Sequence, residues 1–253
     1  MASRRLLMVL SGWDEIADNP SMTETPDYRG YRFPPEIIAR AVWLYHRFTL
    51  SFRDVEDLLA ERGIIVSYET VRQWSARFGP AYARQIKKRM GLRGDRWFLD
   101  EVVVADQGQR RYLWRAVDQD GDLLEVLVQK RKDTPAAKRF FRKVLGSQGQ
   151  VPIEITTDKL RSYAAAKREI LPSVPHCQDR YANNRAEMSH EPTQEQERQM
   201  RGFHSDGQAQ RFLSVHGQCN NLFRLGRHLL AAPNYRMMRQ VAFRTWSQVT
   251  CAC

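Results

Sequence analysis

The apolar residues of this 253-residue chain change their spacing at about Arg96, and this change restricts the fold more than any other feature. Before Arg96 they recur at intervals of three and four, as on one face of an α-helix. After it, three segments have the alternation of β-strands: WFLDEVVVA, RRYLWRAVD and DLLEVLVQ. The turn-rich stretches DQGQ and DQDG separate these segments. The pattern therefore predicts a group of helices followed by a three-stranded antiparallel meander.

The helical part begins at Pro35, a residue suited to a first helical turn, and predicts three short helices. Ser51 is expected to cap the second helix and Gly63 to end it, and Ser67 is expected to cap the third. Three such helices match a helix-turn-helix whose last helix enters the major groove of DNA, although a plain helical bundle explains the pattern equally well. Residues 1–33 are rich in turn-forming residues and are expected to be mostly irregular.

A helix over TPAAKRFFRKVLG follows the meander, with Thr134 as its expected cap and Gly146 at its end. IEITTD predicts a fourth strand, and two helices are expected after it, the second over NNRAEMSHEPTQEQERQMRGF. The order β-β-β-α-β-α-α is that of the RNase H-like fold, so we predict a mixed α/β chain with that core. The expected segments are an irregular segment 1–33, a helix-turn-helix 34–82, a basic linker 83–96, the core 97–200 and a C-terminal helical extension 201–253.

Three acids stand where the RNase H-like fold gathers carboxylates: Asp100 on the first strand, Asp158 just after the fourth and Glu187 in a later helix. Carboxylate oxygens suit Mg²⁺, and a pair of such ions can activate water and stabilise the oxygen displaced at phosphorus. We expect the three acids to hold Mg²⁺, with Mn²⁺ as the alternative, and at least one of these clustered acids to have a raised pKa. Taken singly, Asp158 is better explained as a helix cap and Glu187 as a solvated helical acid.

The net charge of +11, from 40 Lys and Arg against 29 Asp and Glu, indicates a polyanionic partner. Nucleic acid is the first interpretation and an anionic membrane surface the second. Because no apolar run is long enough to span a membrane, the chain is expected to be cytoplasmic. The residues expected to contact DNA lie at the start of the third helix, in the basic segment after it and beside Asp158: Ser67, Tyr68, Thr70, Arg72, Gln73, Arg77, Lys87, Lys88, Arg89 and Lys159.

Longer stretches of the chain carry a family resemblance: RFPPEIIARAVWLYHRFTLSFRDVEDLLAERGIIVSYETVRQW, RYLWRAVDQDGDLLEVLVQKRKDTPAAKRFFRKVLG, TTDKLRSYAAAKREILPSV and NNRAEMSH. They resemble the DDE transposases of bacterial insertion-sequence family six. The resemblance implies an enzyme that binds terminal inverted repeats and performs Mg²⁺-dependent cleavage and transfer of DNA strands. Its implied partners are the double-stranded DNA of the element ends and of the target, and further copies of itself in a homodimer or higher oligomer near the bacterial nucleoid.

The resemblance assigns the catalytic triad to Asp100, Asp158 and Glu187, and one nearby position departs from the family pattern. Family members usually carry a basic residue seven positions after the glutamate, where this chain has Gln194. Because a lost phosphate contact weakens DNA binding without removing a metal ligand, we expect reduced activity with metal binding retained. Two other functions are open: a non-enzymatic, sequence-specific DNA-binding regulator or inactive remnant, and a stand-alone RNase H-like nuclease.

Overall fold

The N-terminal helices form where the apolar spacing places them. The computed structural model describes residues 26–91, 93–106, 109–178, 195, 198, 200, 202–225 and 230–251. The first helices are α2 (Pro35–Arg47), α3 (Phe52–Ala60) and α4 (Tyr68–Arg89). Ser51 caps α3 as expected, since its hydroxyl accepts from the Asp54 amide while the Asp54 carboxylate accepts from the Ser51 amide. Ser67 caps α4 by accepting from the Thr70 amide.

The segment 83–96, expected to be a basic linker, is helical in its first half, because α4 continues to Arg89. Tyr82, Ala83 and Ile86 are buried at the spacing of an apolar helix face. Pro80 lies inside this helix, where a proline removes a backbone hydrogen bond, and the burial of these side chains offsets that cost. The basic residues of this segment therefore project from a packed helix.

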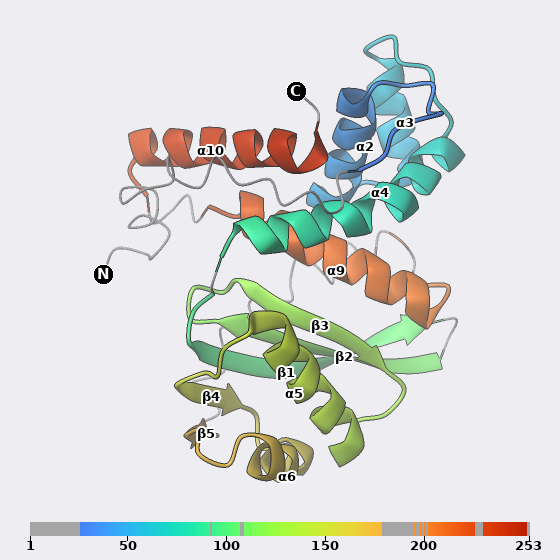
Figure 1. Cartoon of the computed structure of the whole chain (residues 1–253). Helices are drawn as coiled ribbons and strands as arrows, with labels where there is room; N and C mark the ends of the chain where they lie inside the picture. Colours follow the sequence, from blue (N-terminus) through green and yellow to red (C-terminus); the bar gives the residue numbers. More distant parts are fainter. Residues whose placement is uncertain are drawn as a thin grey trace.

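Five strands form one mixed sheet in the order β3-β2-β1-β4-β5 (Figure 1). The meander consists of β1 (Arg96–Asp106), β2 (Gln109–Asp118) and β3 (Leu123–Gln129), each antiparallel to its neighbour. β4 (Glu154–Thr157) and β5 (His176–Cys177) add in parallel on the other side of β1. This is the RNase H-like topology expected from the sequence. β5 was not expected, because a two-residue strand is too short to show a period.

The helix α5 (Thr134–Gln148) crosses from β3 to β4, and α6 (Arg161–Ile170) follows β4. Both limits expected for α5 are wrong. The cap is Asp133, whose carboxylate accepts from the Ala136 amide, because Thr134 already has helical geometry. The helix passes Gly146 and ends where Gly149 takes a left-handed conformation with φ of 66°.

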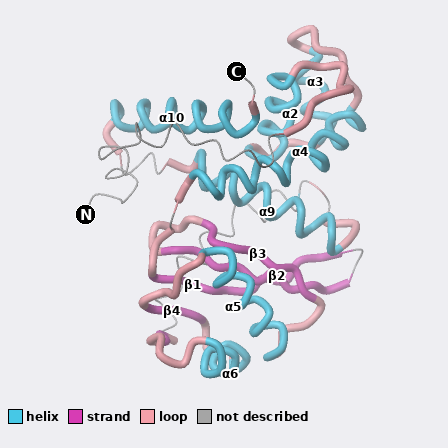
Figure 2. The backbone as a smooth tube through the Cα atoms, viewed as in Figure 1, coloured by secondary structure: helices cyan, strands magenta, loops and turns pink. Residues whose placement is uncertain are grey.

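The sheet lies between two helical layers (Figure 2). On one face, α5 and α6 cover a core that includes Trp97, Trp114, Phe140 and Phe141. On the other face, α9 (Asp206–Phe223) lies between the sheet and the N-terminal helices, and α10 (Ala232–Thr250) packs against α4. One continuous apolar cluster joins this sheet face to α2, α3, α4, α9 and α10. The predicted N-terminal and C-terminal segments therefore share a core.

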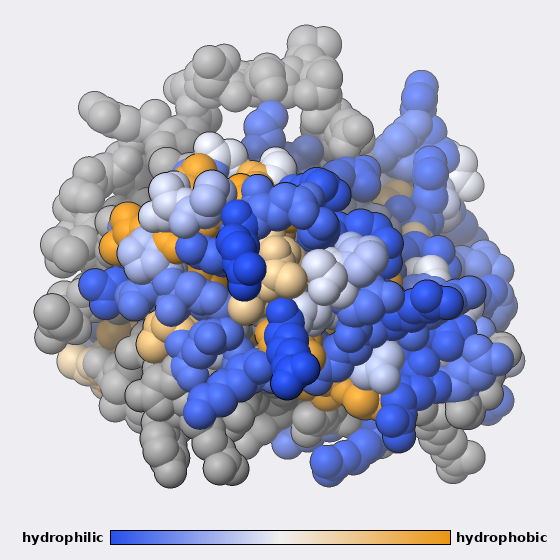
Figure 3. Space-filling model, turned by 90° about the horizontal axis from the view of Figure 1, so that it is seen from below, coloured by the Kyte–Doolittle hydropathy of each residue, from blue (hydrophilic) through white to orange (hydrophobic). Residues whose placement is uncertain are grey.

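The described surface on one face of the molecule is largely hydrophilic (Figure 3). In the view of Figure 3, hydrophilic side chains cover most of the described surface, and hydrophobic ones form only small groups. Among the described residues, no helix has both the length and the apolar character that crossing a membrane requires.

Candidate active site

Asp100 and Asp158, the first two acids of the predicted triad, lie together. β4 runs parallel to β1 with Thr157 beside Leu99, so Asp158 leaves the end of β4 next to Asp100 on β1. Together with Glu101 they form a cluster in which one carboxylate oxygen of each residue lies within 4.8 Å of the others. Sheet topology thus brings together acids that are far apart in the sequence.

Glu101 is the member of this cluster that sequence reasoning missed. Side chains alternate between the faces of a strand, so the residue after Asp100 is expected to point away from the site. A signal was nevertheless present, because an acid within the apolar strand WFLDEVVVA is seldom buried without a charged partner. That partner is Lys132, in the loop between β3 and α5, whose ammonium pairs with Glu101 Oε1.

The electrostatics of Glu101 are unusual for a glutamate. Burial raises the pKa of its carboxyl to about 7, and the nearby charge of Asp158 acts in the same direction while Lys132 opposes both. The buried Tyr163 hydroxyl lies close by, and burial together with the Glu101 charge raises its pKa well above the ordinary value. The Tyr163 hydroxyl and the Glu101 carboxylate interact with each other, but neither Glu101 Oε2 nor Tyr163 Oη makes a well-formed hydrogen bond in the part of the chain that the structure describes.

The loop after β4 positions Asp158. Its Oδ1 accepts from the Leu160 amide at 3.0 Å, two residues further along, so Asp158 is not the N-cap of α6. The Thr157 hydroxyl donates to the Asp158 carbonyl at 2.7 Å and lies 2.8 Å from His176 Nε2 on β5. Lys159, a predicted DNA contact, is exposed directly beside the acid.

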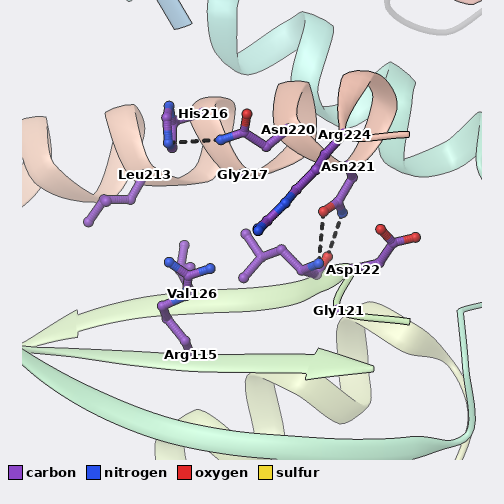
Figure 4. A pocket seen from close by; sticks show the side chains of 11 residues that line it. Arg115, Gly121, Asp122, Val126, Leu213, His216, Gly217, Asn220, Asn221 and Arg224 are labelled. Atoms are coloured by element: carbon purple, nitrogen blue, oxygen red, sulfur yellow. Dashed lines mark hydrogen bonds between the residues drawn. The ribbon is translucent and has the colours of Figure 1, made fainter. Parts of the chain in front are cut away.

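On the sheet face that α9 covers, Asp100 lies opposite Arg115 of β2 in the antiparallel register. Arg115 is buried, and burial lowers its pKa to about 10 while the charge of Asp100 opposes that shift. Figure 4 shows Arg115 and Arg224 pointing from β2 and from the end of α9 into one small cavity, which His216 and Asn221 also line. Positive charge therefore approaches the acids from the α9 side.

The third acid of the predicted triad, Glu187, lies outside the described residues, as does Gln194. A raised pKa in this cluster is found on Glu101, which is not one of the three acids for which it was expected, and burial is its largest cause.

The predicted DNA contacts at the start of α4 make local interactions. Ser67 Oγ lies 3.0 Å from Thr70 Oγ1 and completes the helix cap. The guanidinium of Arg53 on α3 lies over the Tyr68 ring, 4.6 Å from its centroid. These contacts connect α3 to the start of α4.

The next residues of α4 carry a surface ion pair. Arg72 donates to Glu69 through Nε and Nη2 at 2.7 and 2.6 Å, and Gln73 donates to the same carboxylate at 3.1 Å. The Arg72 guanidinium lowers the pKa of the Glu69 carboxyl to about 2. Arg77 is exposed one turn further along.

The basic end of α4 is used partly for packing. Lys87 pairs with Glu125 of β3 at 2.8 Å, and Arg89 donates to Gln248 of α10 at 2.8 Å. Lys88 is exposed between them. Two of the three predicted phosphate contacts at this end therefore hold α4 against other elements.

Comparison with known proteins decides the family. The family model for the DDE domain of the IS240 type matches residues 94–225. The transposase for insertion sequence-like element IS431mec of Staphylococcus aureus strain Mu50 is 30% identical over 168 residues, which are 64% of this chain and 75% of that protein. The chain belongs to the DDE transposases of insertion-sequence family six. A second relative of this family, the transposase for IS257 in transposon Tn4003 of S. aureus, is 29% identical over the same length and the same shares of both chains.

Two solved structures are similar to this transposase at 13% identity. One is the HTLV-2 integrase catalytic core domain in complex with magnesium, with a TM-score of 0.37 over 53% of this chain and 89% of that one. The other is the simian T-cell lymphotropic virus intasome in complex with a PP2A regulatory subunit, with a TM-score of 0.40 over 53% of this chain and 50% of that one.

As a DDE transposase the chain is a polynucleotidyl transferase, and its family uses a divalent metal ion. The clustered side chains fit such an ion on two grounds. Their donors are carboxylate oxygens, which hard divalent cations prefer. The buried Glu101 Oε2 also makes no well-formed hydrogen bond within the described residues, where the Tyr163 hydroxyl interacts with this carboxylate only weakly.

Proposed function

We propose that this transposase binds the terminal inverted repeats of an insertion sequence and uses Mg²⁺, held by Asp100, Asp158 and Glu187, to cleave the element ends and join them to target DNA. The observation that carries the proposal is the meeting of Asp100 and Asp158 within one cluster of ligand atoms at the end of β4. Family membership supports the reaction class, and the net charge of +11 supports a DNA substrate.

Some side chains of the site would hold the ion, and others would bind the DNA. Asp100 and Asp158 would hold the ion, with Glu187 as the third ligand. When bound, a divalent cation supplies a Lewis acid that polarises the phosphodiester and strengthens water or a DNA 3′-hydroxyl as a nucleophile. Lys159, exposed beside Asp158, would bind a DNA phosphate and orient the strand at the acids.

We assign end recognition to the predicted helix-turn-helix, with α4 as the helix that enters the major groove. The exposed Arg72 and Gln73 suit base edges, and they share the Glu69 carboxylate in the absence of DNA. Ser67, Tyr68, Thr70, Arg77 and Lys88 would contact the backbone or flanking bases. Two element ends must meet for joining, so we propose assembly as a homodimer or a higher oligomer.

The test compares Asp100→Asn with the full-length wild type, using DNA that carries an element end, target DNA and Mg²⁺. Cleavage and joining are expected to fall at least about a thousandfold, because an amide cannot replace the carboxylate charge at the metal, whereas end binding is retained. Asp120→Asn, in the exposed turn between β2 and β3, is the matched control and should leave both activities unchanged.

Three outcomes would contradict the proposal. Cleavage by Asp100→Asn would remove this site from the reaction. Binding without cleavage by the wild type would favour the DNA-binding regulator, a reading to which Gln194 gives some weight. Cleavage without joining would favour a nuclease.

A further inference from the structure

The pairing of β4 with β1 ends at the acid cluster. β4 pairs with β1 only from Arg96 to Leu99, whereas β1 continues to Asp106 beside β2. Asp100 is therefore the first β1 residue beyond the pairing with β4. Asp100 and Glu101 leave opposite faces of the strand, and their ligand atoms nevertheless come within 4.8 Å of each other and of Asp158. Asp100 and Glu101 thus bring their carboxylates to the same site from opposite faces of β1.

Glu101 lies at that site with one oxygen satisfied and one not. Its side chain is only 2% exposed, and Lys132 pairs with Oε1. Oε2 is buried and makes no well-formed hydrogen bond among the residues that the structure describes, although the Tyr163 hydroxyl interacts weakly with the Glu101 carboxylate. A buried carboxylate oxygen without a well-formed hydrogen bond is costly, so native proteins seldom leave one without a ligand to satisfy it. The observation is independent of the clustering of the acids.

A second glutamate with a largely buried side chain, Glu125, provides a comparison, because lysines of the protein pair with both of its oxygens. Glu125 on β3 pairs with Lys87 at 2.8 Å and with Lys143 at 3.3 Å, so each of its oxygens has a cation. These lysines lower the pKa of its carboxyl despite burial. Glu101 has one lysine and two carboxylate neighbours, so its surroundings lack positive charge.

We propose that Glu101 is a further ligand of the divalent cation that Asp100 and Asp158 hold, and that Lys132 keeps its carboxylate in place for that role. The ion would supply the positive charge that the surroundings of Glu101 lack, and Oε2 would be the oxygen that meets it. This inference rests on the proposed function and adds a fourth carboxylate, from the α6 side of the sheet, to the three already assigned.

The experiment measures metal binding without DNA, so that it does not depend on catalysis. Mn²⁺ alone is titrated into the full-length chain, and electron paramagnetic resonance reports the unbound ion into the millimolar range. Glu101→Gln should weaken Mn²⁺ binding about tenfold or more, the effect typical of losing a group in a metal site. Glu125→Gln, which removes a buried glutamate charge from a lysine pair away from the cluster, should change the affinity less than about twofold.

Two further variants separate the possible failures. Asp100→Asn should also weaken Mn²⁺ binding, because the proposed function places the ion there. If it does so while Glu101→Gln binds like the wild type, the inference about Glu101 is overturned and the proposed function stands. If neither the wild type nor either variant binds Mn²⁺ at these acids, both the inference about Glu101 and the proposed function are overturned. Should circular dichroism show that Glu101→Gln does not fold, Glu101→Asp replaces it: the retracted carboxylate should weaken binding, and wild-type affinity would refute the inference.

Discussion

The two faces of the sheet are buried in different ways. Against α5 and α6 the core is mostly apolar, with Trp97, Trp114 and Phe140 fully buried, and its buried Glu101 and Tyr163 oxygens lie at the acid cluster. Against α9 the apolar cluster surrounds buried polar groups. His216 bridges α9 to α2, and Asn221 bridges α9 to β3.

The difference indicates a division of roles. Apolar contacts are strong in sum but do not require one geometry, whereas hydrogen bonds do. The α5 and α6 face therefore supplies much of the stability of the sheet. The α9 face additionally fixes how the N-terminal helices, which we propose bind the element ends, sit on the sheet that carries the acids. Asp100 and Glu101 lie where the two faces meet at the edge of β1.

The largest expected effect tests the apolar face. Phe140→Ala should lower the free energy of unfolding by about 3–5 kcal/mol, because it removes a fully buried ring and leaves a cavity. The loss should be the same at pH 8 and pH 5, measured by urea denaturation, since the ring itself does not titrate. Val103→Ala, on an exposed side chain, is the control and should cost less than about 0.5 kcal/mol. A loss for Phe140→Ala that depended strongly on pH would contradict an apolar face of this kind.

The next effect tests the polar face through its two buried histidines. The Asn220 amide donates to His216 Nε2 at 2.9 Å, so that nitrogen accepts and Nδ1 donates to the His46 carbonyl at 3.0 Å. His216 is therefore neutral. Both rings stack on Phe212, and neither nitrogen of His46 has a hydrogen-bond partner among the described residues. A proton added to either ring would be buried without compensation.

Burial lowers the pKa of His46 to about 3 and of His216 to about 4, from the ordinary 6.5. The unfolded chain therefore takes up protons below about pH 6.5 while the folded chain does not. Stability from these groups is complete above that pH and falls on acidification, by about 2 kcal/mol for each histidine at pH 5. His46→Phe keeps the stacked ring and should remove about half of this pH dependence in urea denaturation. An unchanged pH dependence in the variant would show that His46 is not responsible.

Sequence reasoning predicted the elements that carry a strong period and missed features set by packing. The alternation around Trp97 and Trp114 predicted the meander, and the topology then placed Asp158 beside Asp100. Glu101 was missed because alternation alone sends it to the opposite face, and only the end of β4 allows it to join the cluster. The helical part beyond Pro80 was missed because burial of Tyr82 and Ile86 outweighs the cost of an internal proline.

The smallest expected effect compares hydrogen bonds to neighbouring backbone groups from opposite faces. Asn221 accepts from the Leu123 amide and donates to the Leu123 carbonyl, both at 2.8 Å and both buried. Gln148 of α5 donates to the Leu124 carbonyl at 3.0 Å from a partly exposed position. Asn221→Ala should cost about 1–3 kcal/mol of unfolding free energy, because water cannot easily reach the two groups left behind.

Gln148→Ala should cost less than about 1 kcal/mol in the same urea titration, since solvent can replace the hydrogen bond to the Leu124 carbonyl. Because Leu123 and Leu124 are adjacent on β3, the pair of variants isolates the effect of the face from that of the strand. Equal costs would show that the α9 face is no more dependent on its hydrogen bonds than the α5 face. A larger cost for Asn221→Ala, accompanied by weaker binding of element-end DNA, would show that this bridge also holds the N-terminal helices in place for their proposed role.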